Sequence, residues 1–481
     1  MAAVDKTREL ETKGIGALLW EYALPAVVSQ IVTSVYNIVD RIFLGHSPDG
    51  NGTLYLAALA ITFPVMNIIH AFGSLVGAGA SSRMSIVLGR KDTRWAEKIL
   101  GNTMLLTFFF GFLFVTAGYV WMRPILTLFG ASPQTLDFAC QYMDIVLPGM
   151  FLVTLTYNLT GLIRASGYPT KAMWIMISGA VLNILLDYLF ISVFGKGVAG
   201  AAWGTTISMA MTGLVSVVHF VQPRSFIRFR AHAWAPKLYI FRNILAIGIS
   251  PFSMNVAAFA VVAVLNKMLS LYGGDNAVAV YGVVNSAAGL ILMMFLGVCQ
   301  GMQPIAGYNY GANRNDRLRE VYMLTMKVCV ALGIFGTALS MLFPREIISC
   351  FDNEEAILSV GVPAMRYLMA FAPLIAFTIV NSQLFQSIDQ PWIAIVTSLS
   401  RQVIFLIPIS LILPGIIARN GGDGVTGVWL SCMICDFLGA ALSAVLLLTH
   451  RQVFHEGYVA PMRKPRKELG PKDESSQITD K

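Results

Sequence analysis

Residues 17–45 read ALLWEYALPAVVSQIVTSVYNIVDRIFLG, an apolar run that contains only one glutamate, one aspartate and one arginine. A helix needs about 20 apolar residues to cross the hydrocarbon core of a bilayer, and this run is longer than that. It is also too long for the apolar part of a signal peptide, and it follows a charged segment, residues 1–13. We therefore interpret it as a first membrane-spanning helix.

Eleven further apolar runs of similar length follow the first. They cover residues 54–80, 98–121, 138–162, 171–194, 198–221, 243–272, 278–303, 320–343, 359–385, 392–414 and 425–449. The chain is 56% hydrophobic and only 12% charged, whereas soluble proteins carry about 25% charged residues. A transmembrane barrel would show alternating segments of about ten residues instead. The sequence predicts an all-α integral membrane protein with about twelve spans.

The net charge of +8 is distributed unevenly between the predicted loops. If the N-terminus lies inside, the inner segments hold 24 lysines and arginines and the outer loops hold 4. Basic loops stay on the cytoplasmic side of a membrane. This asymmetry predicts a multi-pass protein of the cell membrane, inner or plasma, with both termini in the cytoplasm. Topology thus accounts for the basic charge, and we expect no nucleic-acid partner.

The two halves of the chain resemble each other at an offset of 222–227 residues. Residues 79–89 (GASSRMSIVLG) align with residues 301–311 (GMQPIAGYNYG), with the same glycine spacing. Because each half holds six spans, the two copies lie parallel. Parallel repeats are typical of transporters that handle substrate at the repeat interface.

This repeat divides the chain into four parts. They are an N-lobe of spans one to six (1–221), a basic cytoplasmic linker (222–242), a C-lobe of spans seven to twelve (243–450) and a disordered cytoplasmic tail (451–481).

Pro25 and Pro251 occupy matching places inside the first and seventh spans. Proline removes a backbone donor and kinks a helix. A static bend is common in membrane helices, but the matching positions favour a hinge in each half.

Two aspartates lie within the predicted spans of the first half. Asp40 lies near the outer end of the first span, and Asp187 lies deep in the fifth. Ionisable groups at membrane depth are costly and are therefore candidates for function. Asn183 and Tyr36 each precede one of these acids by four residues, so each shares a helix face with it.

A short connection joins the fifth span to the sixth. At about 1.5 Å per residue, it brings Ala201 and Thr205 to the depth of Asp187. Two carboxyl groups with amide and hydroxyl oxygens in a dry pocket can bind a proton or a sodium ion, because burial and like-charge repulsion disfavour their ionised forms. The alternative is an aspartate, neutral or paired with Arg41, that only holds helices together.

The second half lacks this acid pair. The position of Asp40 and Arg41 reads Asn266 and Lys267 there, so we expect ion coupling in the N-lobe. Asp144 and Asp436 are weaker candidates. The chain shows no phosphate-binding loop, metal-ligand cluster or nucleophile–base pair within its spans. We expect no enzyme activity and no cofactor or metal other than a coupling ion, and a channel remains a less favoured alternative.

Four stretches resemble the multidrug and toxic compound extrusion (MATE) family, in particular its bacterial DinF- and MepA-like branch. They are LPAVVSQIVTSVYNIVDRIFLGH (24–46), GLIRASGYPTKAMWIMISGAVLNILLDYLFI (161–191), GVAGAAWGTTIS (197–208) and QPIAGYNYGANR (303–314). The resemblance extends over about residues 15–450. It implies two six-helix lobes that form a V around a central cavity, and drug export by antiport with protons or sodium.

The resemblance also implies where coupling and substrate binding take place. By motif match, the N-lobe coupling cluster falls on Tyr36, Asp40, Asn183, Asp187, Ala201, Thr205 and Met209. Asn158 matches an asparagine that contacts drugs, so Tyr36, Asn158 and Met209 are the expected substrate contacts. The NorM-like branch carries an acid in the seventh span, where this chain has Asn255, so C-lobe sodium coupling is not expected.

We therefore expect a monomeric exporter of small amphipathic, mostly cationic compounds, embedded in the lipid bilayer. The same superfamily contains flippases for polysaccharides and lipid-linked saccharides. Their cavities tend to be cationic, and the few arginines within these spans make flipping the lesser alternative.

Overall fold

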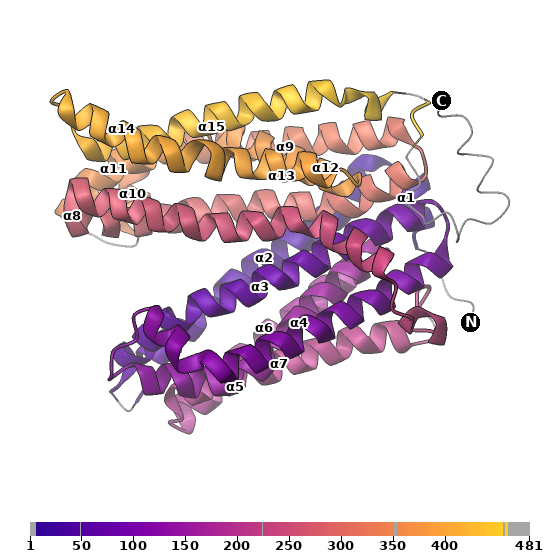
Figure 1. Cartoon of the computed structure of the whole chain (residues 1–481), viewed down its shortest axis with the longest axis horizontal. Helices are drawn as coiled ribbons and strands as arrows, with labels where there is room; N and C mark the ends of the chain where they lie inside the picture. The colour runs from indigo at the N-terminus through magenta and orange to yellow at the C-terminus, as the bar shows by residue number, and fades with distance from the viewer. Residues whose placement is uncertain (1–5, 49, 224, 351–353, 456, 460–481) are drawn as a thin grey trace.

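The computed structural model describes residues 6–48, 50–223, 225–350, 354–455 and 457–459. Its regular elements in these ranges are helices (Figure 1). In chain order they are α1 Arg8–Thr12, α2 Ile15–Gly45, α3 Gly52–Gly89, α4 Thr93–Leu128, α5 Leu136–Ala165, α6 Pro169–Asp187, the π-helix η1 Tyr188–Val193, α7 Gly197–Val221, η2 Ala231–Trp234, α8 Leu238–Gly311, α9 Asn315–Leu342, α10 Pro344–Ser349, α11 Glu355–Met369, α12 Ala372–Ser387, α13 Pro391–Leu399, the π-helix η3 Ser400–Leu406, α14 Ile407–Arg419, α15 Gly424–Thr449 and η4 Arg451–Phe454.

Most of these helices have the length and composition of membrane spans. Ten pass this test among the described residues, and α11 with α12, bent by 45°, forms an eleventh. The 74 residues of α8 would extend about 110 Å if straight, far more than a hydrocarbon core of about 30 Å. The helix breaks at Gly274, whose φ of 67° is left-handed. If the two arms of α8 are counted as separate spans, the total is compatible with the twelve spans predicted from the sequence.

Local sequence explains where several helices begin. The side chain of Asp92 accepts a hydrogen bond from the Trp95 backbone N–H at 2.9 Å and so caps α4. Pro169 and Pro391 begin α6 and α13, where the missing proline N–H has no helical partner to lose.

The backbone repeats between the two halves. Lys91 (φ 60°) and Asn313 (φ 55°) are 222 residues apart, and so are Gly167 (φ 98°) and Asp389 (φ 60°). Side chains other than glycine rarely adopt this left-handed conformation. The same two turns therefore recur in each half, in the register of the sequence repeat.

The helices form two bundles that meet at one end and diverge toward the other (Figure 1). The first contains α2 to α7 and the second α8 to α15, and both chain ends lie where the bundles meet, here called the terminal end. A Cβ on Gly79 would lie 2.0 Å from the Ile244 carbonyl oxygen, and one on Gly248 would lie 1.6 Å from that of Leu75. Small residues thus let the two backbones touch. One apolar core extends across both bundles, and each bundle also has a core of its own.

The predicted tail begins as a docked segment. Asn315 of α9 donates hydrogen bonds to the carbonyl oxygens of His455 (3.0 Å) and Tyr458 (2.8 Å), and Phe454 stacks on Tyr322. The remainder of the predicted tail, residues 460–481, lies outside the described residues.

Candidate functional site

Helices α2 and α6 pack side by side in the N-terminal bundle and bring Asp40 and Asp187 together. Their carboxyl groups lie within electrostatic range of each other. Asp40 is 9% exposed and Asp187 is fully buried. Two carboxylates this close, away from water, repel each other and lose their hydration when both are charged. An arrangement of this kind disfavours two bare negative charges.

Asn183 and Thr205 complete a polar cluster around this pair. The Asn183 amide donates to Asp187 Oδ1 and to Thr205 Oγ1, both at 3.5 Å. Asp40 Oδ1, Asp187 Oδ2 and Asn183 Oδ1 are buried and have no hydrogen-bond partner in the described part of the chain. Buried oxygens are normally satisfied. These three oxygens are therefore suited to accept a proton or to coordinate a hard cation.

Two local features make room for the cluster. A Cβ on Gly204 would lie 2.3 Å from Asp187 Oδ1, so only glycine lets α7 approach this carboxylate. Ala201, one turn earlier on α7, is fully buried. The fifth span also changes from α-helix to the π-helix η1 directly after Asp187, and such π segments are frequent at functional sites.

Two tyrosines adjoin the carboxyl pair. Tyr36 is half-buried and lies within electrostatic range of both acids. Tyr142 of α5 is buried and interacts with the same two acids. The sequence prediction missed Tyr142, because helical spacing relates residues on one helix and carries no information about the approach of α5.

The two other predicted substrate contacts are Asn158 on α5 and Met209, one turn beyond Thr205 on α7. Asn158 is 16 residues beyond Tyr142 on α5, which is about 24 Å along the helix axis. Met209 is buried between α5 and α7, where its carbonyl accepts a hydrogen bond from Thr156 Oγ1 at 3.4 Å. Asn158 is therefore separated from the carboxyl pair.

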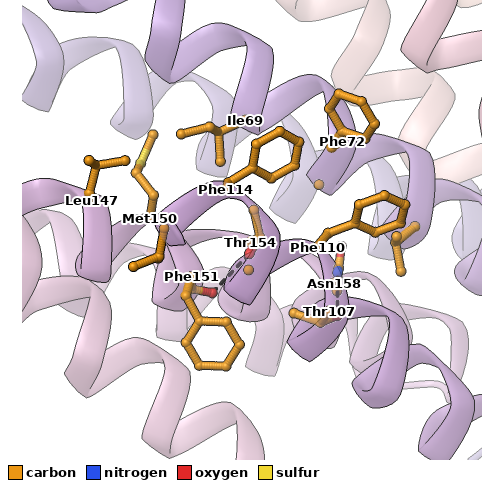
Figure 2. Close-up of a pocket in the computed structure, with 14 residues that line it drawn as sticks. Ile69, Phe72, Thr107, Phe110, Phe114, Leu147, Met150, Phe151, Thr154 and Asn158 are labelled. Carbon is orange, nitrogen blue, oxygen red and sulfur yellow. Dashed lines mark hydrogen bonds between the residues drawn. The ribbon is translucent and has the colours of Figure 1, made fainter. Parts of the chain in front are cut away.

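Asn158 lines an apolar crevice between α3, α4 and α5 (Figure 2). Its amide donates to Thr107 Oγ1 at 2.8 Å, and its carbonyl oxygen is buried without a partner in the described residues. Aromatic rings form much of the wall, from Phe72, Phe110, Phe114 and Phe151. The crevice holds only about 10 Å³ of free space in this structure, less than a drug-sized compound needs.

The chain was compared with known protein families. The sequence model of the MatE family matches residues 25–189 and 251–412, once in each half. The chain belongs to the MatE family.

Curated relatives and solved structures extend this result. The chain is 26% identical over 433 residues to the multidrug export protein MepA of Staphylococcus aureus (strain NCTC 8325 / PS 47). This alignment covers 89% of this chain and 92% of MepA. It is 24% identical over 432 residues to MepA of Staphylococcus saprophyticus, with the same coverage. The fold is similar to that of a MOP superfamily transporter from Pyrococcus furiosus (TM-score 0.86, 23% identity, 95% of this chain and 100% of the other). A MATE structure in the bent conformation gives a TM-score of 0.86 at 24% identity, over 94% of this chain and 98% of the other.

In this MatE chain the two predicted hinge prolines lie in the contact between the bundles. Helix α2 continues through Pro25, and Gly301 of α8 packs against Ala23 just before it. The Pro251 carbonyl accepts a hydrogen bond from Asn255 at 2.8 Å, and the same amide donates to Ser74 of α3 at 3.3 Å. The hinge role of both prolines stays a prediction.

The C-terminal bundle of the MatE chain holds an acid of its own. Arg401, on the π-helix η3, donates to Asp436 Oδ1 at 2.5 Å, and both residues line a cavity of about 240 Å³ inside that bundle. Arg401 is thus paired with a buried carboxylate inside the bundle. Unlike the Asp40–Asp187 pair, this acid is neutralised.

Proposed function

We propose that this protein is a cation-coupled antiporter that exports small amphipathic, mostly cationic organic compounds. The observation that carries the proposal is the Asp40–Asp187 pair, which is buried in the N-terminal bundle and forms no salt bridge in the described part of the chain. Arg41 acts on Asp40 through a longer-range charge interaction. Arg41, the nearest base in sequence, is exposed and places its guanidinium over the ring of Phe63 at 5.6 Å. The positive charge that this site requires would then come from the coupling ion.

A proton is the coupling ion that this geometry favours. One proton bound to two adjacent, buried carboxyl groups would remove the repulsion between their charges and let one group donate to the other. Sodium would instead bind among several oxygens, and the three unpartnered oxygens of the cluster make it the second candidate.

Ion binding at the pair would be transmitted through α2. Because α2 carries Asp40 and packs through Ala23 and Val27 against the glycines of α8, neutralising Asp40 would change the contact between the bundles, with Pro25 as the bend. With both termini in the cytoplasm, as the basic loops predict, the diverging ends face outward. Ion entry from outside would then release cargo outward.

The available energy is sufficient for export. One charge that crosses 100 mV releases about 2.3 kcal/mol, and each 1.4 kcal/mol corresponds to a tenfold ratio. One net charge therefore supports an approximately 40-fold concentration gradient before any pH difference is added.

The apolar crevice around Asn158 supports the substrate class. Its aromatic wall would suit amphipathic compounds once the crevice widens beyond the roughly 10 Å³ that it has in this structure, and the staphylococcal relatives carry the name of multidrug exporters. A flippase for anionic headgroups would need unpaired cations in its cavity. Arg401, which lines the C-terminal cavity, is instead neutralised by Asp436.

Dye efflux from proteoliposomes under imposed proton or sodium gradients tests the proposal. Wild-type protein should drive efflux with one of the two ions, and Asp40→Asn and Asp187→Asn should each reduce it to the background of empty liposomes. Asp137→Asn is the matched control, since Asp137 is an exposed acid of the same bundle that pairs with Arg123. Full efflux by either site variant would remove the pair from the coupling mechanism.

A further inference from the structure

The segment that links the two bundles is held in place on the first bundle. Asn102 of α4 donates to the carbonyl oxygens of Ala233 (3.5 Å) and Ala235 (3.2 Å), and its own oxygen accepts from the Lys237 backbone N–H at 2.9 Å. A Cβ on Gly101 would lie 2.1 Å from the Ala233 oxygen. The backbone of the linker therefore packs directly against helix α4 at a defined position.

A buried acid of α4 faces the same segment. Glu97 is 4% exposed, and its two oxygens contact Arg230 Nε at 2.9 Å and His232 Nε2 at 3.2 Å. The charge of Glu97 is thus already balanced by Arg230 on the linker.

A hollow of about 510 Å³ lies between the linker and the start of α4. Its lining consists of Thr93, Arg94, Glu97, Phe226, Arg228, Arg230 and His232. Arg94 and Arg228 have no acidic partner within 4 Å in the described part of the chain, and Arg228 Nε is buried without a hydrogen-bond acceptor. The hollow therefore holds two surplus positive charges and one unsatisfied buried donor. A buried donor is normally paired, so the hollow suits an anion.

A second hollow extends this basic surface. It shares Thr93 and Phe226 with the first and adds Arg8 and Lys91 to its lining. Lys91 is partly balanced by Glu11 at 3.3 Å. The basic surface is therefore wider than one phosphate and suits a headgroup.

Exposed apolar side chains flank the hollow on the linker and on α4. Trp234 and Leu238 are 39% and 82% exposed. Phe109 and Phe112 follow Arg94 by about four and five helical turns, respectively. All three residues therefore lie on the same face of α4. They are 61% and 76% exposed, as side chains that contact lipid would be. The face of α4 that carries Arg94 therefore continues into the hydrocarbon region.

We propose that this hollow binds the phosphate of an anionic phospholipid from the leaflet at the terminal end. Arg94 and Arg228 donate to the phosphate oxygens, which match the planar donor geometry of arginine, and the acyl chains run along the apolar face of α4. Basic pockets at the membrane surface recognise anionic headgroups in this manner. The site is separate from the carboxyl pair and does not depend on the proposed export function.

The test measures binding of dihexanoyl phosphatidylglycerol to the purified full chain in detergent, with dihexanoyl phosphatidylcholine and inorganic phosphate as parallel ligands. Each basic residue near a membrane surface contributes about 1 kcal/mol, which corresponds to about fivefold in affinity. We expect the Arg94→Gln, Arg228→Gln double variant to bind phosphatidylglycerol at least fivefold more weakly. Arg319→Gln is the matched control, because Arg319 is an exposed arginine in α9 of the other bundle, and it should bind like wild type.

Three results overturn the proposal. They are equal affinity of the double variant and wild type, equal binding of phosphatidylcholine, and saturation of the same site by inorganic phosphate at the same concentration. If the double variant does not elute as a folded monodisperse protein, the phosphatidylglycerol affinity of Arg94→Gln alone is compared with that of wild type. Arg94 is exposed, so this single substitution should not disturb folding. The Arg94→Lys, Arg228→Lys variant keeps the charge but loses the planar donors, so it should bind more tightly than the double glutamine variant and more weakly than wild type.

Discussion

The guanidinium of Arg83 lies 2.8 Å from the carboxylate of Asp389, and both side chains are almost fully buried. This ion pair joins α3 of the first bundle to the connection between α12 and α13 of the second. Asp389 adopts a left-handed conformation (φ 60°), and its counterpart in the first half is Gly167. A residue other than glycine costs about 1–2 kcal/mol in this conformation. The ion pair at the terminal end is thus formed by a residue in a conformation that glycine would adopt more easily.

Asp389→Asn should therefore destabilise the contact between the bundles. Breaking a buried pair from one side costs roughly 3–5 kcal/mol, because it leaves a buried charge without its partner. Thermal unfolding in detergent should show a clear decrease in Tm. Asp137→Asn is the control, since it removes the carboxylate of an exposed pair with Arg123, a type worth only about 0–1 kcal/mol. Equal decreases in the two variants would contradict a locking role for the Arg83–Asp389 pair.

Gly204→Ala should impair coupling without unfolding the protein. The new methyl group would lie 2.3 Å from Asp187 Oδ1 and push that carboxylate away from Asn183. A hydrogen bond to a charged group is worth about 1.5–3 kcal/mol, so proton-driven dye efflux should fall at least about tenfold. Gly282→Ala is the control, because a Cβ there meets no atom within 4 Å among the described residues. Unchanged efflux by Gly204→Ala would show that close packing around Asp187 is not needed.

Asn102→Ala should release the linker from α4. The substitution removes hydrogen bonds to three backbone groups, each worth about 1 kcal/mol. Limited trypsin digestion should cleave after Arg228 or Arg230 at least about tenfold faster than in wild type. Asn67→Ala is the control, since the Asn67 amide bonds only the carbonyl of Phe63 on its own helix. If both variants resist trypsin equally, the linker is held by other contacts.

Asn158→Ala should change substrate affinity rather than ion coupling. Loss of one neutral hydrogen bond costs about 0.5–1.5 kcal/mol, which predicts a roughly two- to thirteenfold increase in the KM for dye efflux. Proton uptake that follows addition of a saturating dye concentration should remain, because Asn158 lies about 24 Å along α5 from Tyr142 beside the carboxyl pair. An unchanged KM for every dye tested would place the substrate outside the Asn158 crevice.

Much of the fold could be predicted because its determinants are local. The hydrocarbon core sets the length of each apolar run, and helical periodicity places Asn183 on the face of Asp187. The repeat of residues 79–89 in residues 301–311 recurs in the backbone, since the left-handed Lys91 and Asn313 follow the two copies at the same distance. These properties need no knowledge of which helices touch.

The sequence by itself determined the all-helical membrane architecture, the two repeated halves and the MATE resemblance. The length of the apolar runs, their periodicity and the order of the motifs are all properties of the linear sequence. Only the tertiary structure could bring Tyr142 beside the carboxyl pair, join Arg83 to Asp389, turn Arg401 toward Asp436 and dock the linker on Asn102. Each of these contacts joins residues that are tens to hundreds of positions apart. Their meeting depends on how helix faces pack against one another, and the spacing of residues within a single helix does not specify that packing.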